Sequence, residues 1–419
     1  MFKNNKALAS IILVVFIDLL GFSLILPLLP YLARTFQATD LQIGLLVAIY
    51  AAAQLIGAPI LGRLSDRFGR RPILLISIAG NAVGFLLLGL ANSLEMLFLS
   101  RLLAGLTAAN ISVAQAYVSD VTDRQNRARG LGLIGAAFGL GFIIGPATGG
   151  VLSQFGYGLP AFMAAGLSTL NFLLVSFWLP ESLAREQRTS STMKQRSPLS
   201  IPALIEALRR PLTGPLLHTR FFFGLAFSLL QTIFSLYALS RFNLGAQSTG
   251  YILAYIGVLS VITQGVLVGR LTARFSETRL ILSATMLMAV GLLGWGLAPN
   301  LGVLLVSLIP TAISGGLLNT VINSALSKTV PPEQVGGILG LSTSLEAFTR
   351  VIAPSLGGVL LDVVGKRYGV MAGTAAPGVL ASGILTWLSF YIYRYIYRPQ
   401  VRMQQAAMEA IGTPVDPDC

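Results

Sequence analysis

Twelve long apolar runs constrain this chain more than any other feature of its sequence. A helix needs about 20 predominantly apolar residues to cross a bilayer, and charged or Pro/Gly-rich joints separate runs of that length here. Only 11% of the residues are charged, whereas a soluble domain carries about 25%, which excludes a soluble enzyme. We therefore predict an all-α membrane protein with twelve transmembrane helices. The expected spans are 7–29, 41–62, 72–91, 95–117, 130–152, 159–180, 216–240, 248–271, 278–298, 301–326, 337–361 and 370–394.

The two halves of the chain resemble each other, which predicts two pseudo-repeats of six helices. The stretch GRLSDRF at 62–68 aligns with GRLTARF at 269–275, at an offset of 207 residues, and PATGGVL at 146–152 aligns with PSLGGVL at 354–360. In parallel repeats a binding site lies near the bilayer midplane between the halves and opens to each side in turn. We expect an N-terminal bundle (1–180), a cytoplasmic linker (181–215), a C-terminal bundle (216–395) and a cytoplasmic tail (396–419).

Lys and Arg are distributed unevenly between the two ends of the expected spans. With the N-terminus placed in the cytoplasm, 23 of the 29 lie on the cytoplasmic side, four lie outside, and Arg101 and Arg350 lie within spans. Basic residues concentrate on the cytoplasmic side, so we expect both termini there, with the chain in the inner membrane. The net charge of +13 then reflects topology and contact with anionic lipid, not nucleic-acid binding. We expect the first run, which lacks a cleavage pattern, to be a retained helix.

A charge cluster occupies the expected loop between the second and third spans. Residues 62–72 read GRLSDRFGRRP, with four arginines around Asp66 and with Gly69 suited to a tight turn. A basic, hydrophilic turn explains the arginines but not the aspartate. The stretch resembles the loop signature of the major facilitator superfamily, G-x-L-[SA]-D-[RK]-x-G-R-[RK], at every fixed position.

Two further motifs strengthen this resemblance. RLLAG at 101–105 resembles the R-x-x-x-G of the superfamily, and GFIIGPATGG at 141–150 matches G-x-x-x-G-P-x-x-G-G, a signature associated with antiporters. The first span and residues 119–123 are most similar to the tetracycline-type, proton-driven drug exporters. The resemblance covers the first half closely and the second half more weakly, and it implies the major facilitator fold.

The small residues of the antiporter motif have a physical meaning of their own. Gly141 and Gly145 share one helical face, where a neighbouring helix can approach closely. Pro146 removes a backbone donor and bends the helix, and Gly149 and Gly150 complete the motif. Generic small-residue packing is one interpretation. The other, implied by the resemblance, is a tight seam that excludes protons and flexes during exchange.

Four ionisable residues lie well inside the expected spans: Asp18, Arg101, Glu346 and Arg350. A charge costs roughly 2.5–3.5 kcal/mol at the centre of a transmembrane helix, so these residues are candidates for proton coupling. Asp18 lies about midway along the first span, where a proton can bind and leave as water access or a cationic partner changes. The alternative is a structural carboxylate that hydrogen-bonds to neighbouring helices.

The sequence leaves the partners of these charges open. Arg101 stays charged at any accessible pH, and by resemblance it influences the protonation of a nearby acid, either Asp18 or Glu346. Glu346 and Arg350 are four residues apart, so they share a helical face and can pair directly. A permanent ion pair is the structural interpretation. If the pair opens, Glu346 becomes a second site for a proton or for a charge on the substrate.

The resemblance also implies a latch on the cytoplasmic side. In the family the loop aspartate faces the amino end of the eleventh span, here about 335–338, where the helix dipole favours an anion, and an arginine bridges two aspartates. The matching residues are Asp66, Arg70, Arg71 and Asp120. The second half has Ala273 in place of Asp66 and Lys328 in place of Asp120. We therefore expect one latch, and a C-terminal rim that opens more easily.

Uncharged polar residues inside the spans are candidates for a substrate-binding cavity, although hydrogen bonds between helices explain each of them equally well. They are Gln54, Asn110, Gln115, Gln231, Gln264, Asn319 and Asn323. The single histidine has no companion with metal-ligand spacing, and no phosphate-binding Gly-Lys-Ser/Thr loop is present. We expect neither a metal nor a cofactor.

These observations predict a secondary active transporter and not an enzyme, because no nucleophile, base and orienting group can be assembled from the sequence. The resemblance implies a proton-coupled antiporter that exports a small hydrophobic or amphipathic compound, as drug-efflux pumps do, by alternating access. Its partners are then the small-molecule substrate, protons and the lipid bilayer. The sequence does not define the oligomeric state, and a monomer is our working expectation.

Tetracycline itself fits poorly as the cargo. Where the tetracycline pumps carry an intramembrane aspartate in the third span, this chain has Ala82, Val83 and Gly84, and the ninth span (278–298) contains no acid where they carry another. A neutral or anionic cargo suits the loss of these acids. The alternatives are a facilitator or proton symporter for a metabolite or organic anion, and a membrane receptor or scaffold that does not transport.

Overall fold

The computed structural model describes residues 2–123, 127–183, 201–331 and 334–399. Within these ranges all regular structure is helical, and twelve helices are long and apolar enough to cross a membrane. The predicted all-α membrane fold is therefore confirmed. Half of the expected linker and most of the expected tail lie outside the described residues.

Two compact units divide the chain. The first comprises Met1–Arg196, Ser228–Val261 and Arg350–Pro377, and the second comprises Ser197–Phe227, Ile262–Thr349 and Gly378–Cys419. Several long helices contribute residues to both units. They are α11 (Thr213–Phe242), α12 (Ala246–Ile262), α16 (Val335–Val359) and α18 (Val370–Ile392).

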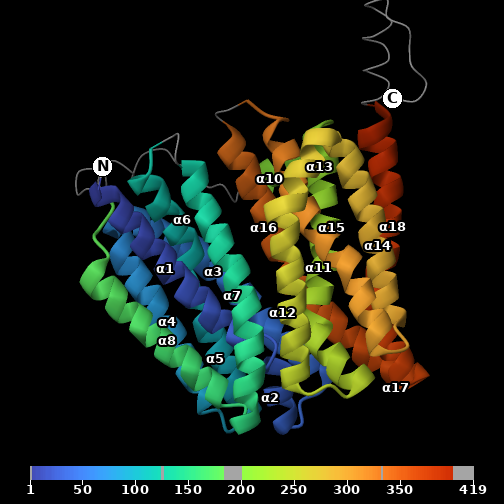
Figure 1. Ribbon diagram of the computed structural model, residues 1–419, viewed down its shortest axis with the longest axis horizontal. Coiled ribbons are helices and arrows are strands. Elements are labelled where there is room, and N and C mark those ends of the chain that lie inside the picture. Colours follow the sequence, from blue (N-terminus) through green and yellow to red (C-terminus); the bar gives the residue numbers. More distant parts are fainter. Residues whose placement is uncertain (1, 124–126, 184–200, 332–333, 400–419) are drawn as a thin grey trace, which may run out of the picture. The chain divides into compact units, whose positions relative to one another are not determined.

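The first unit contains most of the N-terminal half. Helices α1, α4 and α8 lie side by side in it (Figure 1), α7 also packs along α1, and α3 packs against α5. The elements that lie entirely in this unit are α1 (Phe2–Ile25), α2 (Leu29–Thr35), α3 (Asp40–Phe68), α4 (Arg70–Gly89), α5 (Leu94–Thr107), α6 (Asn110–Val121), α7 (Arg127–Leu152), η1 (Ser153–Phe155), α8 (Leu159–Trp178), η4 (Leu360–Val364) and α17 (Gly365–Tyr368).

In the second unit, α14 packs along α15 and also contacts η5. An Asn300 cap begins α15: its Oδ1 accepts a hydrogen bond from the Val303 N–H at 3.0 Å. The elements that lie entirely in this unit are α10 (Ile201–Arg209), η2 (Thr263–Leu267), α13 (Val268–Arg274), α14 (Glu277–Leu297), α15 (Leu301–Ser327) and η5 (Tyr393–Tyr397).

The segment 62–72 is almost entirely helical, which corrects the expected loop. Helix α3 continues to Phe68, where the Gly69 N–H still donates to the Ser65 carbonyl at 3.1 Å. Only Gly69 leaves the helix, with a φ of 109° that favours glycine, and α4 begins at the next residue. The predicted tight turn at Gly69 is present, but it is a single residue long.

The fourth span is two helices instead of one. Helix α5 ends at Thr107 and α6 begins at Asn110. The carbonyl of Ala108, freed at this break, accepts a hydrogen bond from Gln54 Nε2 at 3.4 Å. The break places Asn110 in the first turn of a helix inside the membrane-spanning region, where its side chain is buried.

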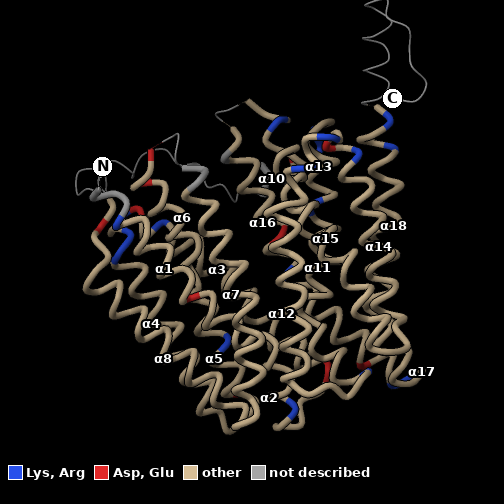
Figure 2. Tube along the Cα trace, viewed as in Figure 1, with Lys and Arg blue, Asp and Glu red and all other residues tan. Residues whose placement is uncertain are grey.

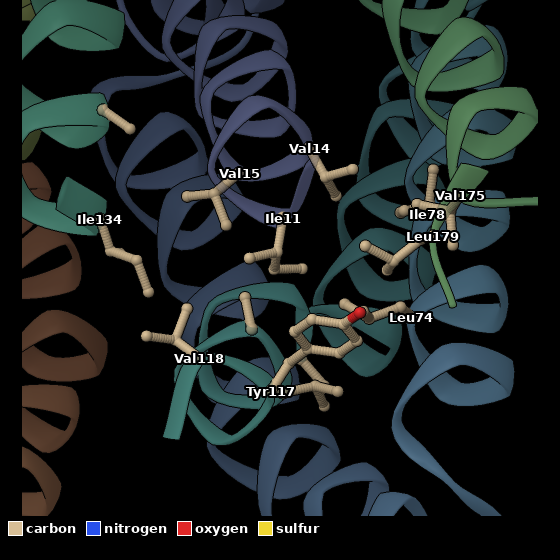
Figure 3. Close-up of a cluster of buried hydrophobic side chains, with 14 of the residues drawn as sticks. Ile11, Val14, Val15, Leu74, Ile78, Tyr117, Val118, Ile134, Val175 and Leu179 are labelled. Carbon is tan, nitrogen blue, oxygen red and sulfur yellow. The ribbon is translucent and has the colours of Figure 1, made fainter. Parts of the chain in front are cut away.

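A buried apolar cluster joins five helices of the first unit (Figure 3). Ile11 comes from α1, Leu74 from α4, Tyr117 from α6, Ile134 from α7 and Val175 from α8, and each is at most 4% exposed. Lipid tails are as apolar as these side chains, so close van der Waals packing holds such a cluster together in a bilayer.

Candidate functional site

Charged residues are sparse along the middle of the helices (Figure 2), and Asp18 is one that the first unit buries, at 8% exposure. Its Oδ1 accepts hydrogen bonds from Nδ2 of Asn81 on α4 at 3.1 Å and from Nδ2 of Asn110 on α6 at 2.6 Å. Among the residues that the structure describes, Asp18 has no ion-pair partner. Two neutral amides from two other helices therefore hold the carboxylate.

Asn81 is a site residue that the sequence analysis missed. It directly precedes the Ala82-Val83-Gly84 stretch, where the tetracycline pumps were expected to carry an acid. An amide in an apolar span was the available signal, and the same criterion did select Asn110. That residue was expected to line a substrate cavity, whereas its Nδ2 is bound to Asp18.

Arg101 of α5 is buried at 4% exposure. Its guanidinium carbon lies 5.6 Å from the centroid of the Phe85 ring, a cation–π contact. Nε and Nη2 are buried and have no hydrogen-bond partner in the described part of the chain. The sequence left the acidic partner of Arg101 open between Asp18 and Glu346. In the described residues Arg101 forms no ion pair with Asp18: two amides bind Asp18 Oδ1, and the guanidinium lies over Phe85.

Tyr50 of α3 lies within electrostatic reach of three predicted proton-coupling residues: Asp18, Arg101 and Arg350. The backbone of α3 also approaches α5 closely here, since a Cβ atom on Gly105 would lie 2.5 Å from the Tyr50 carbonyl oxygen. The Arg101-x-x-x-Gly105 motif therefore supplies both a buried cation and the close contact that positions Tyr50.

The glycines of the antiporter motif pack against α1. A Cβ atom on Gly145 would lie 2.8 Å from Ser23 Cβ, and one on Gly149 would lie 3.2 Å from the Leu24 carbonyl carbon. Ser23 Oγ donates a hydrogen bond to the Gly141 carbonyl at 2.8 Å. The close helix approach that the motif predicts is present along this face of α7.

A different face of the motif packs against α12. A Cβ atom on Gly150 would lie 2.9 Å from Gln247 Cα, and one on Gly250 would lie 3.1 Å from the Pro146 carbonyl carbon. Real Cβ atoms almost never approach their neighbours so closely. Only glycine fits at 150 and 250 without a shift of the two helices.

The second repeat makes the same contact. A Cβ atom on Gly44 of α3 would lie 3.1 Å from the Pro354 carbonyl carbon, and one on Gly358 would lie 3.2 Å from Leu41 Cα. The sequence repeat of PATGGVL and PSLGGVL is therefore also a structural repeat: a glycine of a neighbouring helix packs against the carbonyl group of each proline.

Arg70 bridges Asp66 and Asp120, as the resemblance implied. Its Nη1 lies 2.5 Å from Asp66 Oδ1 and its Nε lies 3.1 Å from Asp120 Oδ2. Glu181, which the sequence analysis did not select, accepts the Arg70 N–H at 2.8 Å at the first turn of α4, where a helix N-terminus favours an anion. The approach of Asp66 to the start of the eleventh span joins two units and stays a prediction.

Arg71 differs from the latch assignment. Its Nε donates to the Val175 carbonyl at 3.3 Å, and its Nη2 donates to the Ser176 carbonyl. It therefore holds the end of α8 instead of an aspartate, because its side chain leaves α4 on a different face from that of Arg70.

The second repeat carries an ion pair of reversed sign where the first carries Arg70 and Asp120. Glu277 aligns with Arg70, and its Oε1 lies 2.8 Å from Nζ of Lys328 and accepts a hydrogen bond from Ser324 Oγ at 2.5 Å. Ala273 removes the counterpart of Asp66, as predicted, but the C-terminal rim is not without a pair. Glu277 is not among the residues predicted from the sequence.

The second unit contains a buried cluster around Arg220 of α11. Arg220 is 3% exposed; its Nη1 donates to Asn319 Oδ1 at 2.7 Å, and its Nη2 forms an ion pair with Glu346. Its Nε is buried without a hydrogen-bond partner in the described ranges. Arg220 was counted among the basic residues of the inner side, although the expected span 216–240 contains it; α11 begins at Thr213, which places Arg220 two turns inside the helix.

Glu346 therefore has a partner that the sequence did not identify. Its side chain is 27% exposed while that of Arg220 is 4% exposed, so the acid is the accessible member of the pair. Arg350 is exposed on the same helix, α16. The direct Glu346–Arg350 pair stays a prediction.

The other predicted polar residues fall into two groups. Asn319 and Asn323 accept hydrogen bonds within the second unit, Asn323 from Ser342 Oγ at 3.2 Å. Gln115 and Gln264 are exposed, and Gln54 and Gln231 are half-buried. In the searched residues no three metal-ligating side chains lie together.

Comparisons with known proteins agree with this fold. The sequence model of the Major Facilitator Superfamily matches residues 11–354 and 262–415. The class H tetracycline resistance protein of Pasteurella multocida is 34% identical over 355 residues, which cover 84% of this chain and 88% of that protein. Multidrug resistance protein 2 of Bacillus subtilis (strain 168) is 30% identical over 371 residues, 86% of this chain and 90% of that protein.

A solved structure is similar over nearly the whole length. The crystal structure of the human organic anion transporter MFSD10 (TETRAN) matches with a TM-score of 0.69 and 25% identity, covering 93% of this chain and 99% of that chain. The fold and the site define a multi-pass membrane transporter and not an enzyme. The chain belongs to the major facilitator superfamily.

Proposed function

We propose that this chain is a proton-coupled antiporter that exports a small hydrophobic or amphipathic compound by alternating access. The observation that carries the proposal is Asp18, a buried carboxylate held by two neutral amides. A carboxylate without an ion-pair partner can take up a proton without separating an ion pair first. Asp18 therefore suits a group that alternates between a protonated and an ionised state.

Arg101 and Tyr50 make this exchange sensitive to substrate. Two nitrogen atoms of Arg101, Nε and Nη2, have no hydrogen-bond partner in the described residues, and Tyr50 lies near both Arg101 and Asp18. A movement of α5 that brings Arg101 toward Asp18 favours loss of the proton, because a nearby cation stabilises the carboxylate. Binding of a substrate that displaces Arg101 or Tyr50 is thus coupled to the protonation of Asp18.

The repeated glycine contacts support the alternating movement. Each repeat brings a proline carbonyl against a glycine of a neighbouring helix, so two equivalent seams can form and separate together. The pair Arg70–Asp120 and its reversed counterpart Glu277–Lys328 lie on helix ends at the basic side. We propose that Asp66, Arg70 and Asp120 act as the cytoplasmic latch.

The membrane orientation is part of the same proposal. The excess of Lys and Arg on one side of the spans supports cytoplasmic N- and C-termini in a bacterial-type inner membrane. N-terminal residues 1–180 and C-terminal residues 216–395 are then the two bundles that move during transport.

The test is substrate-driven proton flux in proteoliposomes that contain the full chain. Three probes sample the cargo classes: tetracycline, ethidium as a lipophilic cation and fluorescein as an organic anion. For any probe that is transported, wild type is expected to move protons in the opposite direction. Asp18→Asn keeps the shape of the side chain but cannot ionise, and it should abolish the coupled proton flux.

Asp362→Asn is the matched control, because Asp362 is a half-exposed carboxylate that pairs with Lys366 at 3.0 Å near a helix end. It should leave the proton flux unchanged. Coupled antiport that survives in Asp18→Asn rejects the assignment of Asp18. Binding of all probes without flux in wild type supports a receptor or scaffold instead.

A facilitator or proton symporter for an organic anion is the second candidate. Its supporting observation is the pair of buried arginines, Arg101 and Arg220, each with at least one N–H group that has no hydrogen-bond partner among the described residues. Guanidinium groups bind carboxylates and phosphates in a planar, two-point geometry. Fluorescein uptake that follows an inward proton gradient, and that falls in Arg101→Gln, would favour this function over antiport.

A further inference from the structure

A groove of about 370 Å³ lies between α13, α14 and α15 in the second unit. Leu271 and Phe275 form one wall, Ser283 and Leu287 form another, and Ser314 lies at its floor. The lining is apolar apart from these two serines and Arg279. The volume is in the range of small-ligand sites.

The groove opens on a surface that faces lipid. On α14, Met286, Leu287 and Val290 are 50%, 42% and 67% exposed, and apolar exposure of this kind on a membrane-spanning helix is contact with acyl chains. The other side of α14 packs along α15. A ligand from the bilayer therefore reaches the groove sideways, without passing through the protein.

Cations lie at one end of the groove. Arg279 is part of its lining, and Arg274 lies one turn after Leu271 on α13. Both are exposed, and neither makes an ion pair or a hydrogen bond through its side chain with a described residue. They stand at the start of α14, on the side of the membrane where the basic segments lie.

The second repeat lacks an acid that the first repeat carries beside the arginine equivalent to Arg274. In the first repeat Asp66 directly precedes Arg67, the counterpart of Arg274, and is bound by Arg70. In the second repeat Ala273 replaces it, and the nearby Glu277 is already engaged by Lys328 and Ser324. The positive charges of Arg274 and Arg279 thus have no acidic partner among the described residues.

We infer that this groove binds one anionic phospholipid of the cytoplasmic leaflet. One acyl chain lies along Phe275, Ser283 and Leu287, and the headgroup phosphate contacts Arg274 and Arg279. Charge complementarity selects an anionic lipid, because basic pockets between transmembrane helices bind such headgroups, and the apolar lining selects a lipid over a free anion.

The experiment measures lipid association with the full chain in nanodiscs of phosphatidylcholine, using spin-labelled phosphatidylglycerol and spin-labelled phosphatidylcholine. Wild type should prefer phosphatidylglycerol. Arg274→Gln and Arg279→Gln should each lower the preference about fivefold. Arg209→Gln removes the same charge from an exposed position on α10 and should leave it unchanged.

Two further arms separate the possible ligands. Ser283→Leu fills the groove with a side chain that lipid-facing helices tolerate, and it should release phosphatidylglycerol while leaving Arg274 and Arg279 intact. Soluble glycerol phosphate should not compete with the lipid. Equal association of both lipids, an unchanged preference in both arginine variants, or full competition by glycerol phosphate would overturn the inference.

Discussion

Gly250 of α12 meets the carbonyl group of Pro146 on α7 so closely that a Cβ atom there would lie 3.1 Å from the carbonyl carbon. Gly44 makes the same approach to Pro354. Two sequence-distant pairs thus share one geometry, and the antiporter motif and its degenerate copy in the second half serve the same packing purpose.

Gly250→Ala should destabilise the protein by about 1–3 kcal/mol, the usual cost of overpacking a tight contact, and should slow transport. The measurement is thermal unfolding in detergent together with transport in liposomes. Gly265→Ala is the matched control, because a Cβ atom at Gly265 meets nothing within 4 Å. Equal melting temperatures for the two variants would contradict the contact.

Gly145→Ala should disrupt the packing of α7 on α1, because the new Cβ atom would lie 2.8 Å from Ser23 Cβ. The additional change Ser23→Gly removes that obstacle and should recover part of the lost thermal stability. Gly135→Ala lies on the same helix in open space and should be neutral. Absence of any recovery in the double variant would argue against a clash with Ser23.

Tyr50→Phe removes one hydroxyl group and keeps the ring. Its effect on stability should not exceed about 1 kcal/mol, whereas the number of protons moved per substrate should fall, because the variant lacks the neutral hydroxyl group that Tyr50 places near Asp18 and Arg101. The ratio of proton to substrate flux in liposomes measures this. Tyr251→Phe, at a 50% exposed residue, is the control, and an unchanged ratio in Tyr50→Phe would exclude a role in coupling.

Arg220→Gln should cost about 3–5 kcal/mol, since it leaves Glu346 without its arginine in a largely buried site. Combining it with Glu346→Gln should restore most of the stability, because two neutral amides can hydrogen-bond to each other. Thermal unfolding of the two single variants and the double variant forms a complete cycle. A loss of stability in the double variant equal to the sum of the two single losses would mean that the pair is not energetically coupled.

Lys328→Glu should lower stability by no more than about 1 kcal/mol, because Lys328 is 69% exposed and surface pairs contribute little. Adding Glu277→Lys should reverse the loss by restoring opposite charges. Arg70→Gln should be more damaging, at about 3 kcal/mol, since its side chain is 10% exposed and bonds two aspartates. Similar melting temperatures for Arg70→Gln and Lys328→Glu would contradict this ranking.

The sequence predicted the elements that depend on local patterns. Twelve apolar runs give twelve spans, and Gly69 gives the turn, because length, hydropathy and backbone freedom are local properties. The glycines at 141, 145 and 149 also predicted their contact, because glycines on one face of a helix allow a neighbouring helix to approach closely.

Partners in space were harder to predict. Arg220 lies near the start of the expected span 216–240, so its charge was assigned to the membrane surface, whereas α11 begins at Thr213 and places Arg220 two turns inside the helix. Asn81 is an amide in an apolar span, the same signal that selected Asn110, but nothing in the sequence around it indicated that Asp18 is its partner. The position of Arg101 over Phe85 depends on how α4 and α5 pack. That packing could not be predicted from the sequence alone.

The reversed pair Glu277–Lys328 has a consequence for the ancestry of the two halves. Transferring one residue of the pair to the sister repeat would bring like charges together: a glutamate at position 70 would face Asp120, and a lysine at position 120 would face Arg70. In each repeat the two charged residues of the pair can therefore be exchanged only together, so single residues can no longer be swapped between the duplicated halves.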